Sequence, residues 1–425
     1  MPLARLLGII LLLFLAGSAA AQVSHGAPAD DADRFALTRS EATGPADFAP
    51  RIALLTMAPG EVYWTRFGHN ALLVADSESG SETVYNYGIF DFDQPDFLAR
   101  FLRGHMRYRL AALPAAWDLP HYQAEGREVV VQWLALEPQQ ARTLAAFLEN
   151  NALPANAEYD YHYFLDNCST RVRDALDRAL GGALRHQTVS RSRGFTWRAH
   201  ASRLSAPDPW LWLGIDLGLG PRADQRLSAW DEMFVPMAMR DYLRGVRLDP
   251  AADSRELVQE ELVWSPARLG TPPDLPPEPF RPFLALGMLL GAFLWVFLGP
   301  AHARGAGRVA AATLAGLFWL FAGLAGLVLL ALWLFTDHTF AHRNENLFLI
   351  NPVALALLPA AWAMLRGRPP TRVQFVLAAT VAAIATAGFV LKGLPFFIQQ
   401  NAHWIALFLP VHIGLALALR ARETR

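Results

Sequence analysis

Five long apolar stretches occupy the second half of the chain, and they constrain its fold more than any other feature. A helix rises about 1.5 Å per residue and the hydrocarbon of a bilayer is about 30 Å thick, so each stretch is long enough, or nearly so, to cross a membrane as a helix. The stretches cover residues 283–299, 309–335, 347–365, 373–394 and 403–419. The sequence therefore predicts a five-helix transmembrane domain over residues 283–425.

Basic residues between these stretches predict how the bundle is oriented. Cytoplasmic loops of membrane proteins carry an excess of Lys and Arg. If the preceding domain is exported, the cytoplasmic side holds Arg304, Arg308, Arg366, Arg368, Arg372, Arg420, Arg422 and Arg425. The outer loops then keep only Arg343 and Lys392. We therefore expect a multi-pass membrane protein with a cytoplasmic C-terminus.

The start of the chain predicts export. Residues 1–21 contain a basic residue, a short apolar run and a final row of alanines, which is the pattern of a secretory signal peptide. Residues 22–50 are typical of a flexible leader. An exported domain over residues 51–264 and a proline-rich, semi-rigid linker over residues 265–282 are expected to follow.

Charge and cysteine content exclude several classes of function. The formal net charge is −1, whereas a nucleic-acid-binding protein needs a basic surface. The chain has a single cysteine, Cys168, so it can form neither a disulfide framework nor a cysteine-based zinc site. We expect no cofactor and no metal.

The exported domain reads as an α+β fold. Residues 62–74 and 83–92 are predicted strands on either side of a turn, so they form a hairpin with His69 near the end far from the turn. A third strand over residues 128–136 is expected to join the same sheet, and residues 139–150 read as a helix.

The cysteine lies at the start of a second predicted helix. Asn167 is a good N-cap for a helix from Cys168 to about residue 180. The N–H groups and dipole of a helix N-terminus favour a thiolate and stabilise an oxyanion. A nucleophilic cysteine needs a base, for which His69 is the first candidate and His162 the second. The alternative is that Cys168 is a small buried apolar residue.

This order, a strand histidine before a helix-cap cysteine, resembles the circularly permuted NlpC/P60 papain-like fold and the lecithin:retinol acyltransferase-type enzymes. More closely, the chain resembles the Lnb lipoprotein N-acyltransferase family of bacterial inner-membrane proteins. The matching stretches are Phe67-Gly68-His69-Asn70, residues 85–92, residues 161–174 around Asn167-Cys168-Ser169-Thr170, residues 210–220 with Asp224, Asn344-Glu345-Asn346-Leu347 and Asn351-Pro352.

The resemblance implies a function and a set of catalytic residues. A diacylglyceryl-lipoprotein, or another membrane lipid, would donate an acyl chain to an amine through a thioester on Cys168. His69 would act as the base. Asn86 on the next strand is the best candidate for the third, orienting group, with Tyr85 and Tyr87 as rivals, because a one-residue slip in register would exchange their faces.

Further residues are predicted to contribute to the site. Asn167 is a supporting catalytic candidate, and Tyr163 is a candidate for substrate binding. Arg171 could bind an anionic lipid group, or pair with Asp174 or Asp177 on its own helix. Trp210 and Trp212 could dip into the membrane interface or belong to the core of the exported domain.

Two outer loops of the bundle are unusually polar. One contains His338 and His342, whose i, i+4 spacing could hold a metal if the loop were helical. The other contains Gln399, Asn401 and His403. Such groups either mark function or merely solvate helix ends.

Two other functions compete with acyl transfer. The permuted fold also serves cysteine peptidases and amidases that act on cell-wall peptides, and a non-enzymatic membrane scaffold would need Cys168 only for structure. Five membrane helices are superfluous for a soluble-wall hydrolase, which favours the acyltransferase.

Overall fold

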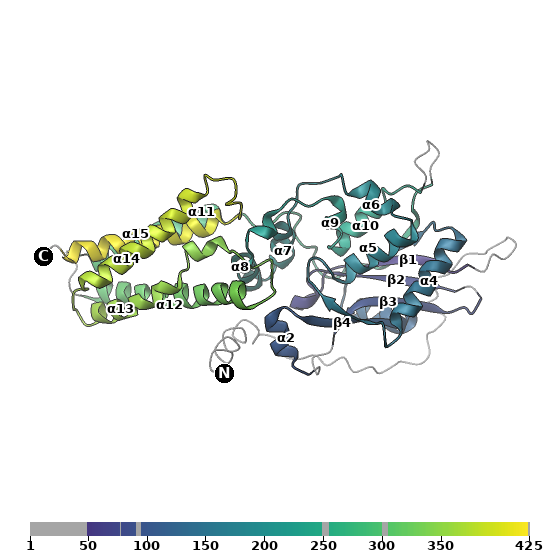
Figure 1. Cartoon of the computed structure of the whole chain (residues 1–425), viewed down its shortest axis with the longest axis horizontal. Coiled ribbons are helices and arrows are strands. Elements are labelled where there is room, and N and C mark those ends of the chain that lie inside the picture. The colour runs from purple at the N-terminus through teal and green to yellow at the C-terminus, as the bar shows by residue number, and fades with distance from the viewer. Residues whose placement is uncertain (1–48, 77, 91–94, 249–254, 300–304, 424–425) are drawn as a thin grey trace. The chain divides into compact units, whose positions relative to one another are not determined.

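The computed structural model describes residues 49–423 except 77, 91–94, 249–254 and 300–304. The predicted signal peptide and nearly all of the predicted leader fall outside the described residues. The described chain contains an α+β domain followed by membrane-spanning helices, as the sequence predicts (Figure 1).

The α+β domain is built on a seven-stranded sheet in the order β6-β4-β3-β2-β1-β5-β7. Every neighbouring pair in it is antiparallel. The strands are β1 (Arg51–Met57), β2 (His69–Ala75), β3 (Glu82–Ile89), β4 (Met106–Pro114), β5 (Val129–Leu134), β6 (Glu158–Tyr161) and β7 (Val258–Ser265). The predicted hairpin is β2–β3, and the third predicted strand, β5, joins the sheet beside β1.

The two faces of the sheet carry different helices. Alternating side chains such as Leu72 and Tyr85 form one core with α4 (Pro138–Ala152) and α5 (Cys168–Ala179), visible in front of the sheet in Figure 1. The helix α3 (Ala115–Ala124) packs against β3, β4 and β5.

Shorter helices complete this domain. They are α2 (Phe97–Arg103), α6 (Ala183–Thr188), α7 (Trp197–Ser205), α8 (Pro209–Gly218), α9 (Ala229–Glu232) and α10 (Pro236–Leu243).

The prediction of a strand over residues 62–74 is wrong for its first part. Tyr63–Thr65 form a turn of 3-10 helix, and β2 begins only at His69. The reason is Gly68, which has a φ of +79° and whose missing Cβ would lie 2.9 Å from the carbonyl oxygen of Met57. The chain therefore turns sharply just before His69. This makes His69 the first residue of β2, at the end of the strand far from the β2–β3 turn.

Five described segments are long and apolar enough to cross a membrane. Four are continuous helices, α11 (Phe280–Leu298), α12 (Ala306–Phe335), α14 (Arg372–Leu391) and α15 (Ala402–Glu423). The predicted third helix is instead two short 3-10 segments, Glu345–Phe348 and Pro352–Leu357, followed by α13 (Leu358–Leu365). Pro352 and Pro359 lack the N–H groups that a continuous helix needs.

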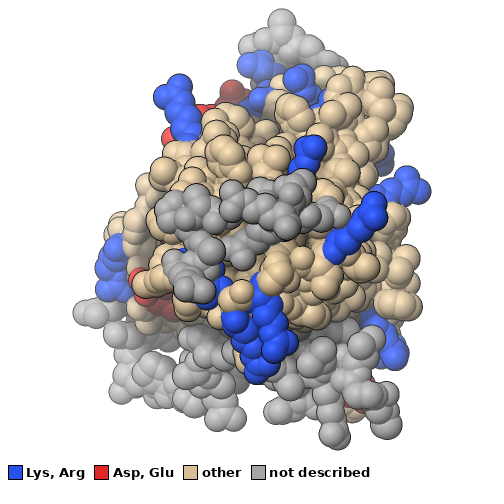
Figure 2. All heavy atoms as spheres, turned by 90° about the vertical axis from the view of Figure 1, so that its left-hand side faces the viewer, with Lys and Arg blue, Asp and Glu red and all other residues tan. Residues whose placement is uncertain are grey.

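Basic side chains gather at the bundle end that faces the viewer in Figure 2, where more blue than red is seen. Arginines near the helix ends described there include Arg308, Arg366, Arg368 and Arg372. They belong to the loops that the sequence assigns to the cytoplasmic side.

Candidate active site

Cys168 is the first residue of α5, and the residue before it caps the helix. The side-chain oxygen of Asn167 accepts the Thr170 N–H at 2.9 Å, and the Thr170 hydroxyl accepts the Asn167 N–H at 2.8 Å. The Asn167 amide also donates to the carbonyls of Tyr163 at 3.1 Å and Phe234 at 3.0 Å. Asn167 thereby fixes the position from which Cys168 projects.

The thiol of Cys168 faces backbone N–H groups. Burial raises the pKa of the thiol, while the N–H groups of Asn70, Ser169 and Cys168 itself and the charge of Arg127 act to lower it. The resting group is therefore a neutral thiol. The same N–H groups point to the place where an oxyanion would develop on a carbonyl attacked by this sulfur.

His69, the first residue of β2, belongs to a chain of three side chains. Its Nε2 lies 3.0 Å from Oδ1 of Asn86 on β3, and Nδ2 of Asn86 donates to a carboxylate oxygen of Asp118 on α3 at 3.1 Å. The structure thus places Asn86, the candidate for the orienting group, in contact with His69. Tyr85 and Tyr87 instead point to the opposite face, into the core beneath α5.

The hydrogen bonds from His69 through Asn86 to Asp118 determine which nitrogen of His69 carries no proton. The Asp118 carboxylate only accepts hydrogen bonds, so the Asn86 NH₂ group faces it and the Asn86 oxygen faces His69. Nε2 of His69 must then carry the proton, which leaves Nδ1 as a lone pair. Burial lowers the pKa of His69 to about 4, with Asn86 acting to raise it and Arg127 to lower it further. The imidazole is therefore neutral at physiological pH.

Cys168 and His69 flank the same strand end, because the thiol faces the N–H of Asn70, the residue after His69. The Asn70 amide also contacts the Ser169 hydroxyl at 2.9 Å, which ties β2 to the first turn of α5. In the part of the chain that the structure describes, no hydrogen bond joins the thiol directly to the imidazole. Catalytic hydrogen bonds often tighten only when substrate binds.

Two buried polar atoms without a hydrogen-bond partner lie near Cys168. One is the hydroxyl of Tyr159; it and Cys168 Cβ lie 3.9 and 3.5 Å from the position that a Cβ on Gly88 would occupy. The other is Nη2 of Arg127, whose guanidinium stacks on Tyr122 at 4.9 Å and acts on Cys168 and His69.

Arg171 has a partner other than the two acidic residues predicted. Its guanidinium forms a two-pronged ion pair with Asp166 and stacks on the ring of Tyr159 at 4.2 Å. Asp166 lies in the loop before α5, where both of its carboxylate oxygens accept hydrogen bonds from the Arg171 guanidinium. The expected pairing with Asp174 or Asp177 is therefore wrong.

The remaining predicted substrate-binding residues lie near the membrane segments. The Tyr163 ring stacks with His338 at 6.3 Å, in the loop after α12. Trp210 is 78% exposed at the start of α8, and Trp212 is partly buried. Leu213 and Leu217 of the same helix pack against the core of the bundle. Substrate binding by Tyr163, Arg171, Trp210 and Trp212 stays a prediction.

His162, the second candidate base, has a different setting. Its Nδ1 accepts the N–H groups of Phe164 at 3.1 Å and Leu165 at 3.2 Å, so its lone pair already shapes the loop before Cys168. His69 is therefore the better candidate base.

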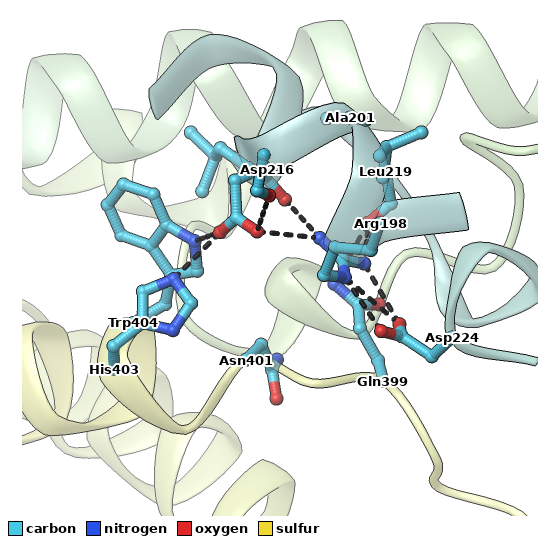
Figure 3. Close-up of polar contacts among 12 residues, drawn as sticks. Arg198, Ala201, Asp216, Leu219, Asp224, Gln399, Asn401, His403 and Trp404 are labelled. Carbon is cyan, nitrogen blue, oxygen red and sulfur yellow. Dashed lines mark hydrogen bonds and ion pairs between the residues drawn. The ribbon is translucent and has the colours of Figure 1, made fainter. Parts of the chain in front are cut away.

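A second buried polar cluster joins α7 and α8 to the bundle, and Figure 3 shows it. The Arg198 guanidinium donates to the carboxylates of Asp224 at 2.8 Å and Asp216 at 3.2 Å. On its other side, Asp216 accepts from Nε2 of His403 and Nε1 of Trp404, each at 2.7 Å. We call these five residues the clasp.

Polar side chains of the outer loops surround the clasp. The Asn344 amide donates to the carbonyls of Leu217 at 2.9 Å and Gly218 at 3.0 Å, at the end of α8, and to that of Leu219 at 3.3 Å. Gln399 donates to the Leu219 carbonyl at 3.1 Å. These loops therefore attach one domain to the other instead of solvating helix ends.

The suggestion that His338 and His342 hold a metal required a helical loop, and this requirement is not met. The loop is not helical, and Nε2 of His338 and of His342 each donate to a backbone carbonyl, of Phe101 at 3.0 Å and Thr336 at 2.9 Å. Among the described residues, no group of three or more His, Cys, Asp or Glu side chains could hold a metal ion.

Sequence reasoning missed Asp118, Arg127 and Arg198. The partners of Asp118 and Arg198 are distant in sequence, so no local pattern marks these two residues, and Arg127 stands out only through its burial. A buried arginine is unusual, but burial is not visible before the fold is known.

Comparison with known proteins gives a family for both domains. Residues 49–203 match the Lnb N-terminal periplasmic domain, and residues 277–423 match the Lnb transmembrane domain. No curated protein and no solved structure matches the chain. Together the two matches cover most of the chain and both of its domains, so the chain belongs to the Lnb family of multi-pass inner-membrane proteins with a periplasmic N-terminal domain.

Proposed function

We propose that this protein is a thiol-dependent acyltransferase at the outer face of the cytoplasmic membrane. It moves an acyl chain from a lipid or diacylglyceryl-lipoprotein to an amine, through a thioester on Cys168. The observation that carries the proposal is the thiol at a helix N-terminus, facing backbone N–H groups beside a neutral histidine with a fixed tautomer.

In the first half-reaction, Sγ of Cys168 attacks the ester carbonyl carbon while Nδ1 of His69 takes the thiol proton. The carbonyl π electrons move onto the oxygen, and the N–H groups around the thiol stabilise this oxyanion. Collapse breaks the ester C–O bond. The departing alkoxide takes the proton from the His69 imidazolium, which leaves a lyso product and a thioester.

In the second half-reaction, a neutral amine attacks the thioester carbon. His69 accepts a proton from the amine as the C–N bond forms, and the C–S bond then breaks. Cys168 leaves as a thiolate and recovers that proton from His69. The products are an amide and the free enzyme, so no other co-reactant is needed.

Asn86 and Asp118 keep the His69 imidazole oriented through both halves. The hydrogen bond from Nε2 prevents the ring from turning its protonated nitrogen to the sulfur, and Asp118 stabilises the Asn86 amide in the required orientation. This arrangement supports Asn86 as the third catalytic residue, with Asn167 positioning the nucleophile.

Membership of the Lnb family supports a lipoprotein as the substrate. The loop that carries Tyr163, five residues before Cys168, packs against His338 and Phe340 of the membrane domain. A nucleophile close to the outer face of the membrane would meet a lipid-anchored ester there. This orientation also has the C-terminus in the cytoplasm.

A product assay tests the proposal. The full chain in nanodiscs is incubated with a diacylglyceryl lipopeptide, and separately with muropeptides, beside the Cys168→Ala variant. An N-acylated lyso-lipopeptide formed only by the wild type is the expected result. Muropeptide cleavage instead would establish a peptidase, and product that survives Cys168→Ala would overturn the thiol mechanism.

A further inference from the structure

The short helix α2 has two chemically different faces. Phe97 and Phe101 are four residues apart, as are Leu98 and Leu102, so these four apolar side chains share one side. The basic Arg100 and Arg103 lie on the other side. None of the apolar four is buried, and Leu98 is 48% exposed. A partly exposed apolar face beside basic residues is typical of helices that lie in a membrane interface.

Three contacts hold the end of α2 at the outer end of the membrane helix α12. The Asp337 N–H donates to the Arg103 carbonyl at 2.7 Å, and His338 donates to the Phe101 carbonyl at 3.0 Å. His105 pairs with Asp337 at 2.9 Å. Gly104 permits this approach, since a Cβ there would lie 3.1 Å from the Asp337 backbone, at a φ of +91°.

The side chains at the outer end of α12 indicate how deep in the bilayer the contact between α2 and α12 lies. The last residues of α12 are apolar and outward-facing, with Leu334 57% and Phe335 72% exposed, and Trp333 precedes them. Such side chains face lipid, and tryptophan favours the headgroup boundary. A seven-residue helix is only about 10 Å long, so all of α2 lies within that distance of the boundary.

The same region continues toward the nucleophile along a row of aromatic rings. The Phe90 ring stacks with Tyr108 of β4 at 5.1 Å, and Tyr108 stacks with Tyr161 at 4.1 Å. Tyr161 follows Tyr159 on β6, and the Tyr159 hydroxyl and Cys168 Cβ lie 3.9 and 3.5 Å from the position that a Cβ on Gly88 would occupy. These aromatic rings therefore lie between α2, which packs on β4, and the surroundings of Cys168.

We propose that α2 is an interfacial helix whose apolar face inserts among the acyl chains of the outer leaflet and delivers lipid to the path toward Cys168. The position of α2 in the membrane interface does not depend on the proposed acyl transfer. Its role in delivering lipid does rest on that proposed function. The partner is the lipid surface itself, chosen because the neighbouring membrane helix ends there and because the exposed Arg103 of α2 suits a phosphate headgroup.

Quenching by lipids tests the position of α2 directly. Because Cys168 is the only cysteine, the Cys168→Ala chain accepts a single label at an introduced cysteine. An environment-sensitive fluorophore is attached at Leu98→Cys or Phe97→Cys, in phosphatidylglycerol–phosphatidylethanolamine nanodiscs with nitroxide-bearing lipids. Leu334→Cys marks the lipid-facing helix, and Leu153→Cys, 52% exposed on the loop after α4, is the matched control.

The proposal predicts quenching at positions 97 and 98 comparable to that at 334 and well above that at 153. Quenching at 97 and 98 no stronger than at 153 would overturn it, whether another part of the chain or water covers the helix. This result does not depend on whether the protein transfers acyl chains.

A second assay tests delivery in the otherwise wild-type chain. Leu98→Glu should lower transfer from a bilayer-embedded lipopeptide about tenfold, because the favourable free energy of burying a leucine side chain among the acyl chains is lost. Reaction with a water-soluble short-chain ester should not change, and Leu153→Glu should leave both rates unchanged. Equal rates for Leu98→Glu and wild type would overturn delivery, whereas a wild type inactive on both substrates would contradict the proposed function instead.

Discussion

The clasp and the buried polar groups around Cys168 differ in how completely they are paired. In the clasp, all three nitrogens of the Arg198 guanidinium have acceptors, and Asp216 is held from both sides. Beside Cys168, the Tyr159 hydroxyl and one nitrogen of Arg127 are buried without a partner. Such an unpaired group costs about 1–3 kcal/mol of stability.

The difference is the one expected between a group of residues that stabilises the fold and a group that, as we propose, carries out a reaction. A fully paired network rigidifies, because moving any member breaks several hydrogen bonds. Unpaired donors next to a nucleophile are typical of a surface that meets the polar atoms of a substrate. The comparison predicts that changes in the clasp act on stability and changes near Cys168 act on rate.

The largest effect on rate, apart from that of the nucleophile itself, is expected for His69→Ala. Loss of a general base lowers kcat by about 10²–10⁴-fold. The melting temperature should fall only modestly, because the one hydrogen bond that the described structure gives the His69 side chain is to Asn86, and leaving that oxygen unpaired costs about 1–3 kcal/mol. Single-turnover kinetics beside His186→Ala, an exposed histidine of α6, check this. A kcat near that of wild type would remove His69 from the mechanism.

Arg198→Met should give the largest loss of stability. It leaves Asp216 and Asp224 buried with their main cation gone, and breaking a buried pair in this way costs about 3–5 kcal/mol in free energy of unfolding. Unfolding in detergent is compared with Arg191→Met, an exposed arginine whose loss should stay within about 0.5 kcal/mol. An equal effect of the two variants would contradict the structural role of the clasp.

Asn86→Ala should have an intermediate effect on rate. The imidazole loses its orienting partner but keeps its basic nitrogen, so kcat should fall by about tenfold to a hundredfold, less than on loss of the base. Asp118→Asn acts only through Asn86 and should cost less than Asn86→Ala. If Asp118→Asn were the more damaging of the two, Asp118 would have a direct role.

The smallest effects are expected in the pH dependence. His69 must be neutral to act as a base, and its pKa of about 4 in the free protein puts the acid limb of kcat/KM near pH 4, well below the usual range of histidine. Arg127→Gln removes a charge that lowers this pKa, so the limb should move to higher pH. Asn86→Ala removes a hydrogen bond that raises it, so the limb should move to lower pH. Shifts in the opposite directions would refute this account of the site.

Local patterns predicted the parts of the site that local chemistry determines. Asn167 is a cap by residue type, Cys168 therefore begins a helix, and alternation within β3 places Asn86 opposite the tyrosines. The start of β2 could not be predicted, because the left-handed turn at Gly68 depends on its close approach to Met57 in another strand.

The clasp and the hydrogen bond from Asn86 to Asp118 could not be predicted from the sequence either. Asp216 and His403 are far apart along the chain and meet only when α8 packs on the bundle. The polarity of the outer loops is visible in the sequence, but their partners are carbonyls and carboxylates of the other domain. Long-range pairing of this kind is set by tertiary packing, so a single sequence does not reveal it.

Intact-mass spectrometry can detect whether Cys168 carries the acyl chain, as we propose. The wild-type chain, Cys168→Ala and His69→Ala are mixed with a diacylglyceryl lipopeptide whose amine is blocked, so that the second half-reaction cannot proceed. We expect a hydroxylamine-sensitive adduct of one acyl chain on wild type, slower formation of the same adduct on His69→Ala and no adduct on Cys168→Ala. An adduct that persists on Cys168→Ala, or a wild type that remains unmodified while it processes the unblocked lipopeptide, would contradict this proposal.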